Sequence, residues 1–565
     1  MAASVDETQD VTAIDSLLNI KRVDPQVGSR VPLRIPSLWA EARLAVSEEQ
    51  AQKSKPTPVQ HSAPDTLPPR NMNDSYTEFT LPFASDINLL EEYVNASGGI
   101  RTGKLMEHLD SLAGSISYKH VLGPTASSVQ NVAEMGLYIV TASVERLDML
   151  RPLNATHDLR FSGQVIYTGK SSMEVAVRIE SLAKDAGEKD ETVLLGRFSM
   201  VCRDAKTNLA HPINALHVST PEESTLFAIG QELKRRRASL AQRSLGRVPP
   251  SSEEAAALHE NFLKFGEVID QPNYIGYHHE TNNEIRTVSS KKNSGLATLD
   301  YTAELVPMGE TRVERCMLMF PQERNVHQKV FGGYLMRLAY ELGFSNASMF
   351  CRGRVRFLAL DEISFKLPVP IGSILRLTSV VLYDDLVKEP GVDGVESVHQ
   401  LVVRLFFFRC YIYRGLGVED LNLFRVLTFT LPLLPPPRLP LAFLSLTTCS
   451  RGPGVGLQNI GVRANVVDIE TGTEKTTNEF RFTWQGEDKL NEDSDSTGTT
   501  ATSSSTNVLG GQQQLLKIRK VRKVAPKTYR EAMLWLGARR AVAVGDDIRE
   551  LIRVKRDKKD DAGTS

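Results

Sequence analysis

Two stretches of the sequence carry residues whose types and spacing could support chemistry at a carbonyl group. In the first, Gly332 and Gly333 lead directly into an amphipathic helix over residues 334–342. Glycines at a helix start let a ligand approach the backbone, and the free N–H groups of the first turn favour negative charge. We therefore expect this turn to hold a carbonyl oxygen that develops charge. A double glycine could also serve only to connect a loop to a helix.

The second stretch supplies a carboxylate. Asp110 lies seven residues after Gly103, two turns into a predicted helix that carries Leu105, Leu109 and Leu112 on one face. Burial at the edge of an apolar surface raises the pKa of a carboxyl group, and this suits a proton acceptor. The competing interpretation is an exposed aspartate on the solvated side of the helix.

The elements around both stretches predict an α+β fold. Runs rich in Val, Ile, Met and Phe are typical of strands. In the first half of the chain they predict strands at 138–149, 159–167, 172–182 and 192–202. In the second half they predict strands at 313–320, 356–365, 374–383, 462–468 and 476–484. One long helix with several strands indicates a helix packed on an antiparallel sheet.

The two halves repeat each other. Residues 149–167 align with 365–383 at a shift of 216 without a gap, and both contain the pattern L-R-[FL]-[ST]-x-x-V-[IL]-Y. The helices align with Gly103 on Gly333, which places Asp110 on Tyr340 and Ser111 on Glu341. Tandem units of this kind predict a pseudo-two-fold pair with sites at the shared interface. Because the halves differ, the two sites need not both work.

The domain prediction follows from these elements and from composition. Ser, Pro, Gln and Lys dominate residues 46–70, and Ser, Thr and Gly dominate 491–512. The predicted parts are a mostly disordered extension (1–70), a first domain (71–217), a helical and polar connector (218–300), a second domain (301–490), a disordered linker (491–512), and a C-terminal helix with a charged tail (513–565).

Composition excludes several classes of protein. With 67 basic and 68 acidic residues, no global charge favours nucleic acid or an anionic membrane as a partner. The five cysteines form no C-x-x-C pair, and no set of residues has metal-ligand spacing, so we expect a reducing compartment and no metal. No apolar run reaches the roughly 18 residues that a membrane helix needs.

Several ordered stretches resemble a known family. A loop ending in Phe-Gly-Gly, a helix starting Tyr-Leu-Met-Arg and the run from Phe365 to Leu377 resemble the hotdog fold. The specific resemblance is to the acyl-coenzyme A thioesterase 9 family, tandem-hotdog thioesterases associated with mitochondria. The matching stretches are PPRNMNDSY (68–76), GKLMEHLDSLAG (103–114), LRFSGQVIYTGKSSMEV (159–175), PQERNVHQKVFGGYLMRLAYEL (321–342) and PKTYREAMLWL (526–536).

The resemblance implies two tandem hotdog domains, each a long helix wrapped by an antiparallel sheet, forming a pseudo-dimer. It implies hydrolysis of acyl-coenzyme A to fatty acid and coenzyme A without a cofactor, and further assembly into a homo-oligomer. It also implies that an Asp on one helix works with an Asn and the helix start of the other half. These residues correspond to Asp110, Asn325 and the Gly332–Gly333 turn. Whether Asp110 activates water or attacks directly stays open.

The matching second site would use Asn95 and Gly103, with Tyr340 in place of the acid and Glu341 beside it. We expect that site to be weak or inactive. A rival reading of the same fold is a dehydratase that uses His327 and Glu341, fourteen residues apart. A third reading is a catalytically silent acyl-coenzyme A-binding scaffold.

Two parts of the chain depart from the family pattern. The first twenty residues contain four acidic residues and no Lys or Arg, the wrong sign for a mitochondrial presequence. The predicted location is therefore mitochondrial by resemblance and otherwise cytoplasmic. Residues 398–457 are rich in Leu, Pro, Phe and Ser, and no acidic residue occurs from Leu421 through Val467. We expect this stretch to be an atypical insertion in the second domain.

Overall fold

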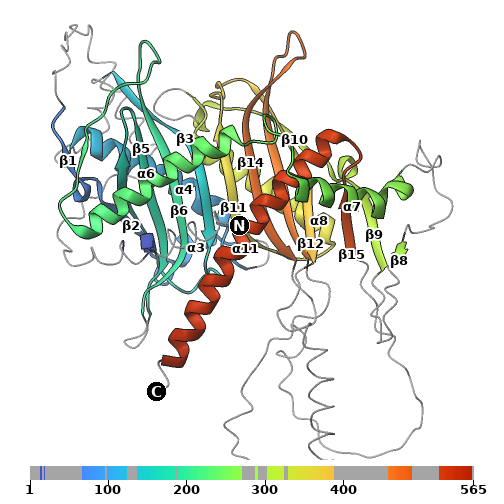
Figure 1. Ribbon diagram of the computed structural model, residues 1–565. Coiled ribbons are helices and arrows are strands. Elements are labelled where there is room, and N and C mark those ends of the chain that lie inside the picture. The colour runs from blue at the N-terminus through green and yellow to red at the C-terminus, as the bar shows by residue number, and fades with distance from the viewer. Residues whose placement is uncertain are drawn as a thin grey trace, which may run out of the picture. The chain divides into compact units, whose positions relative to one another are not determined.

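The computed structural model describes residues 13–15, 18, 67–95, 98–123, 136–184, 189–269, 287–289, 302–323, 329–386, 456–486 and 521–562. A ten-stranded sheet with the order β10-β12-β13-β14-β11-β3-β6-β5-β4-β2 is the largest element of this part of the chain (Figure 1). Its strands pair antiparallel in both halves, as β4–β5 and β13–β14 do. The predicted α+β class with a large antiparallel sheet is confirmed.

The first half of the sheet comes from the N-terminal part of the chain. Its elements are β2 (Thr77–Leu81), α3 (Ile87–Glu91), α4 (Thr102–Leu122), β3 (Leu137–Met149), β4 (Leu159–Thr168), β5 (Ser172–Ser181) and β6 (Glu191–Asp204). Strands β3 to β6 match the four predicted strands closely, because their runs of β-branched and large apolar residues are long and unbroken.

The second half of the sheet has the same order of element types. Its elements are β10 (Val313–Leu318), η5 (Pro321–Glu323), α8 (Gly332–Cys351), β11 (Val355–Phe365), β12 (Ile374–Leu386), β13 (Gly456–Val467) and β14 (Glu474–Gly486). Gly456 and Leu457, the last two residues of the predicted insertion 398–457, begin β13, and Leu457 pairs with Gln485 of β14. The other residues of the predicted insertion lie outside the described part.

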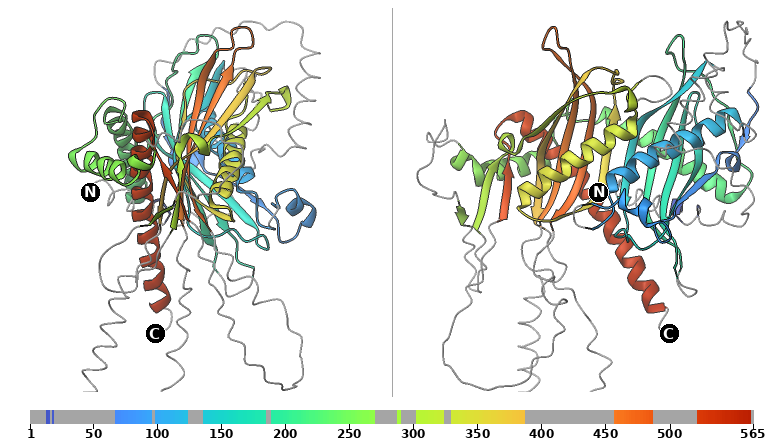
Figure 2. Two further views of the ribbon diagram at one scale, coloured as in Figure 1. Left: turned by 90° about the vertical axis from the view of Figure 1, so that its right-hand side faces the viewer. Right: turned by 180° about the vertical axis from the view of Figure 1, so that it is seen from behind.

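Helices α4 and α8, one from each half, pack on the same face of the sheet and against each other (Figure 2). The apolar side chains that predicted these helices are buried, with Leu105, Leu109, Leu335 and Met336 at most 3% exposed. The other face carries α6 (Pro221–Gln242), α7 (Ser252–Ile269) and α11 (Tyr529–Ala562) (Figure 2). The helical prediction for 218–265 and the C-terminal helix match these elements. None of the described helices is long and apolar enough to cross a membrane.

Irregular features recur in both halves at the spacing of the sequence repeat. Strand β3 has register shifts between Thr141 and Ser143 and between Val144 and Arg146. Strand β11 has them between Phe357 and Ala359 and between Leu360 and Glu362, each 216 residues later. Bulges re-aim the side chains beside them. The residues around Thr141 and Phe357 therefore have matching places in the two halves.

The turns that lead into each half also match. The short helices η2 (Met72–Ser75) and η4 (Met308–Thr311) each end in a hydroxyl residue. Ser75 Oγ accepts the N–H of Val165 at 3.0 Å, and Thr311 Oγ1 accepts the N–H of Val381 at 3.0 Å. Val165 and Val381 are themselves 216 residues apart.

In the described part of the chain, two smaller sheets accompany the ten-stranded sheet. Strands β1 (Arg70–Asn71) and β7 (Leu216–His217) pair parallel, and β15 (Val521–Ala525) pairs parallel with β9 (Thr302–Pro307). Strand β8 (Thr287–Ser289) joins β9 from within the predicted connector. The basic run at 517–527 gave no strand prediction, because Lys and Arg are depleted in strands. Pairing with β9 overrides that preference.

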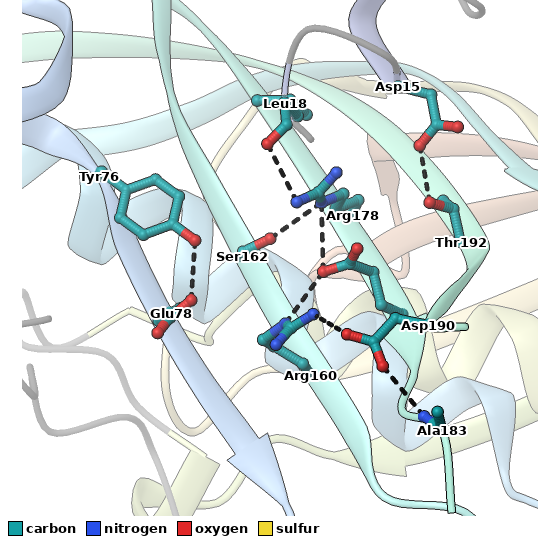
Figure 3. A network of polar contacts seen from close by, with 11 residues as sticks. Asp15, Leu18, Tyr76, Glu78, Arg160, Ser162, Arg178, Ala183, Asp190 and Thr192 are labelled. Carbon is teal, nitrogen blue, oxygen red and sulfur yellow. Dashed lines mark hydrogen bonds and ion pairs between the residues drawn. The ribbon is translucent and has the colours of Figure 1, made fainter. Parts of the chain in front are cut away.

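A piece of the N-terminal extension belongs to the core, which the disorder prediction for 1–70 did not foresee. Residues 13–15 are helical, and Ile14 and Leu18 are 0% and 3% exposed. They pack in a cluster with Ile166 of β4 and Leu226 of α6. The buried Arg178 donates to the carbonyl oxygen of Leu18 at 3.1 Å, and Thr192 donates to Asp15 at 2.7 Å (Figure 3).

Candidate active site

Asp110 lies between the two long helices. The sequence left its exposure open, and the structure shows it 4% exposed, on the side of α4 that faces the start of α8. Its Oδ1 accepts a hydrogen bond from the Thr141 hydroxyl at 2.6 Å, and its carboxylate also accepts the backbone N–H of Gly333. Asp110 and the Gly332–Gly333 turn are therefore brought together, although they are more than 200 residues apart in the chain.

The start of α8 is built to receive this carboxylate. Phe331, the residue before the helix, offers no side-chain cap. The first turn therefore has N–H groups without a capping side chain from its own helix, and Asp110 of α4 takes one of them. The positive end of the helix dipole favours the carboxylate there.

Both glycines of the turn allow this close approach. A Cβ at Gly332 would lie 3.0 Å from Asp110 Oδ2, and one at Gly333 would lie 2.9 Å from the carbonyl oxygen of Glu107. Any larger residue at either position would push the turn away from α4.

Burial raises the pKa of Asp110 to about 6. The hydrogen bonds from Thr141 and Gly333 favour the charged form and limit the rise, while the nearby carboxylate of Glu107 adds to it. The group is therefore ionised at neutral pH yet far more basic than an exposed aspartate. These are the properties of a general base near its working pH.

Thr141 is the residue that sequence reasoning missed. It sits in β3 within a run of strand residues and belongs to no motif. A threonine in a strand is ordinary, so composition and spacing gave no signal for it. Only the packing of β3 against α4 in three dimensions identifies it.

The second pseudo-site has aromatic residues where the first has polar ones. Tyr340 takes the place of Asp110, at the start of α4, where it hydrogen-bonds with Thr102. Phe357, 216 residues after Thr141, stacks edge-on against Tyr340 at 5.3 Å between ring centroids. Trp484 and Phe482 also pack on Tyr340, at 5.0 and 6.1 Å. Burial raises the pKa of the Tyr340 hydroxyl, so it stays neutral.

Of the other residues predicted for the second site, Gly103 contacts Tyr340, whereas the side chains of Asn95 and Glu341 bond elsewhere. Asn95 is exposed, and its side chain bonds its own loop, accepting the N–H of Gly99 at 3.0 Å. Glu341 forms an ion pair with Arg101 at 2.8 Å and lies 3.8 Å from Arg315. Gly103 is at the helix start, in contact with Tyr340 and Arg337. In the described part of the chain no carboxylate takes the place of Asp110 here.

Asn325 and His327 lie outside the described residues. Glu341, the partner predicted for His327 in the dehydratase reading, has its carboxylate turned to Arg101. Among the described residues no group of three or more His, Cys, Asp or Glu could hold a metal ion.

Comparison with known proteins agrees with the sequence resemblance. The chain is 34% identical over 325 residues to human mitochondrial acyl-coenzyme A thioesterase 9, covering 56% of this chain and 66% of that protein. It is 33% identical over 353 residues to the mouse mitochondrial acyl-coenzyme A thioesterase 9, covering 60% of this chain and 72% of that protein. The chain thus spans just under two thirds of the length of the human relative. No protein-family model matches the chain.

Among solved structures, the chain is similar to an apo-hexameric acyl-CoA thioesterase. The identity is 23%, the TM-score is 0.26, and the match covers 31% of this chain and 98% of that one.

Proposed function

Because the chain belongs to the acyl-coenzyme A thioesterase 9 family, we propose that it hydrolyses acyl-coenzyme A thioesters to a fatty acid and free coenzyme A. The observation that carries the proposal is the buried Asp110 carboxylate, held by Thr141 and by the amide of Gly333 at the start of α8. A basic group beside free helix-start N–H groups is what thioester hydrolysis needs.

The proposed reaction begins with Asp110 as the base. Its carboxylate removes a proton from water, and the water oxygen forms a bond to the thioester carbonyl carbon. The resulting oxyanion accepts hydrogen bonds from the first turn of α8, for which we assign the N–H groups of Gly332 and Tyr334, since the Gly333 N–H holds Asp110. The C–S bond then breaks, and the coenzyme A thiolate takes the proton back from Asp110.

Direct attack by Asp110 would give a mixed anhydride that water then hydrolyses to the same products. A single turnover in ¹⁸O-labelled water separates the two routes. The base mechanism places the label in the fatty acid. Direct attack, followed by attack of water on the Asp110 carbonyl carbon of the anhydride, places the label in the Asp110 carboxylate, and the fatty acid of the first turnover carries an unlabelled oxygen from Asp110. In both routes Asn325 keeps its predicted role of orienting water or substrate.

We also infer that the two halves are tandem hotdog units related by a pseudo-two-fold axis. The paired bulges, the Ser75 and Thr311 hydrogen bonds and the reciprocal contacts of Gly103 and Gly333 support it. The aromatic residues around Tyr340 support a single working site for each double unit. Assembly into a larger homo-oligomer is part of the proposal, and its mass in solution checks it.

We propose a mitochondrial location because the human and mouse relatives are named mitochondrial. Fractionation of cells that express the full chain with a C-terminal tag tests the location.

The test of the proposed activity is release of free thiol from a panel of acyl-coenzyme A species of increasing chain length. The proposal predicts thiol release by the wild-type chain that Asp110→Asn abolishes. A silent scaffold would bind the same species without thiol release, and a dehydratase would change the acyl chain while the thioester stays intact.

A further inference from the structure

An ion pair joins the two long helices next to the proposed site. Arg337 Nη1 of α8 donates to Glu107 Oε2 of α4 at 2.9 Å. Both side chains are largely buried, with 23% and 15% of their surface exposed. Each residue lies four positions after the glycine near the start of its own helix, so the two occupy matching positions in the aligned halves.

This pair lies at the closest approach of the helices. A Cβ at Gly333 would meet the Glu107 backbone at 2.9 and 3.0 Å, and a Cβ at Gly103 would meet Arg337 Cγ at 3.2 Å. Each helix start therefore rests on the charged residue of the opposite helix. Moving the pair apart would move the Gly333 amide away from Asp110.

We infer that Glu107 and Arg337 form a positioning pair for the Asp110 site, which fixes the helix crossing that presents the Gly333 amide and balances the charge beside Asp110. The inference rests on the proposed function, but its physical content, the coupling of three charged groups, can be measured independently.

The charges around Asp110 predict the direction in which each substitution shifts its pKa. Glu107 lies three residues before Asp110 on α4, and its negative charge raises the pKa of Asp110. Arg337 neutralises Glu107. Removing Arg337 takes away one positive charge beside Glu107 and Asp110, so the Asp110 pKa should rise. Removing Glu107 leaves the cation unpaired near the site, so the pKa should fall.

The other charged or titratable groups near the pair do not reverse these directions. On α4, Lys104 lies 3.8 Å from Glu92 and also interacts with Glu107 and Arg337, and its charge is the same in every variant compared. Burial lowers the pKa of His108 to about 4, so His108 is neutral at working pH. On α8, the Tyr334 ring lies under the Arg337 guanidinium at 5.0 Å. Glu323 and Arg315 act on Tyr334 from the preceding elements, and from β3 the neutral Thr141 bonds Asp110.

Glu107 and Arg337 can carry opposite charges at matching positions only because the two halves of the chain differ in sequence. In a dimer of identical chains, residues that face each other across the two-fold axis are the same residue. Glu would then face Glu, or Arg would face Arg, and like charges at this distance repel. The fused chain can therefore balance charge at the crossing in a way that a symmetric pair of either half could not.

The test compares pH profiles of kcat/KM for thiol release in the full chain. Arg337→Gln should move the acidic midpoint up by about half to one pH unit, and Glu107→Gln should move it down by a similar amount. The double variant should return the midpoint near wild type, because both charges are lost together. Arg337→Lys keeps the charge and should keep the midpoint.

The matched control is Arg101→Gln, which breaks a second ion pair, between the residue just before α4 and Glu341 of α8, at 2.8 Å. It should leave the midpoint unchanged. The inference is overturned if the two single variants shift the midpoint in the same direction, or leave it unmoved while the melting temperature falls.

A second readout separates failure of this inference from failure of the proposed function. The pH dependence of thermal unfolding, measured with and without Asp110→Asn in each background, reports the Asp110 pKa without any substrate. Opposite shifts in this readout support the inference even if no acyl-coenzyme A species is hydrolysed. Equal profiles in all backgrounds overturn it even if wild type is an active thioesterase.

Discussion

Asp110 is placed where its charge works against the stability of the fold. Burial raises its pKa from 3.8 to about 6, so the folded state binds the proton more tightly than the unfolded state. Stability is therefore fully retained below about pH 4 and is lost as pH rises through about 6. The difference corresponds to on the order of 3 kcal/mol at most.

Asp110→Asn should thus stabilise the protein at pH 8 by about 1–3 kcal/mol while it removes activity. The gain should shrink toward zero near pH 4, because the wild-type carboxyl group is then neutral in both states. Denaturant unfolding of both proteins at pH 4, 6 and 8 measures this. A stability difference that does not change with pH would show that Asp110 titrates like an exposed carboxylate.

Thr141→Val tests the hydroxyl that holds the carboxylate. Valine keeps the shape and the strand preference of threonine but removes the 2.6 Å hydrogen bond to Asp110. Hydrogen bonds to charged groups contribute roughly 1.5–3 kcal/mol, so the acidic midpoint of activity should rise by about one pH unit or more. An unchanged pH profile would mean that Thr141 has no part in holding the ionised form.

At the residue scale the sequence singled out Asp110 and the glycine turn, which the structure brings together, but not the side chains around them. Asp110 and the glycine turn stand out because a carboxylate on an apolar helix face and glycines at a helix start each have few physical uses. Thr141 and Phe357 do not stand out, because both are common in strands and their roles depend on which helix faces them. The pairing of Glu107 with Arg337 likewise depends on the crossing of two helices.

The elements that form the site are held by close backbone contact, and glycine substitutions test this. Gly333→Ala places a Cβ 2.9 Å from the Glu107 carbonyl oxygen and 2.6 Å from the Phe331 ring. We expect activity to fall about 100-fold or more and the melting temperature to drop, because the Gly333 amide moves away from Asp110. Enzyme assays and thermal melts measure both effects.

Gly114→Ala is the matched control within α4. A Cβ there has no atom within 4 Å. Alanine favours the helix over glycine by roughly 0.5–1 kcal/mol, so this variant should be slightly more stable and fully active. Equal losses in the two variants would indicate that glycine is needed for some reason other than the crossing of α4 and α8.

Composition did not predict that Ile14 and Leu18, in the N-terminal extension, are buried. Ile14→Ala should cost about 2–5 kcal/mol of stability because its side chain is fully buried under α6. The same substitution at Ile87, which is 71% exposed, should change stability by less than about 0.5 kcal/mol. Denaturant unfolding of both variants checks the difference, and equal values would argue that Ile14 does not pack against the core in solution.

Sequence patterns predicted most elements but not those that depend on distant partners. Strands β3 to β6 and β11 to β14 have long apolar runs that leave little choice of structure. Residues 13–15 and 18 and strand β15 are short and sit in acidic or basic surroundings. Their structure comes from contacts with Arg178 and the surrounding apolar cluster and from the edge of β9, which no local pattern reveals.

At the scale of the whole molecule, the central seam joins the halves through β3 and β11. A buried Arg146 bridges it, donating to Asp148 at 2.7 Å and to Asp361 of β11 at 3.0 Å. Helices α4 and α8 meet across the same junction. Asp110 of α4 lies beside the start of α8, and Tyr340 of α8 lies beside the start of α4. The two halves thus share their contacts but differ in chemistry.

The most direct measurement is thiol release from the acyl-coenzyme A panel by Asp110→Asn relative to wild type, with circular dichroism to confirm folding. We expect less than about 1% of the activity to remain, because general-base catalysis contributes roughly 100-fold or more and Tyr340 cannot replace it. A folded variant that keeps half of the activity would show a second working site, and one that keeps all of it would contradict the role of Asp110.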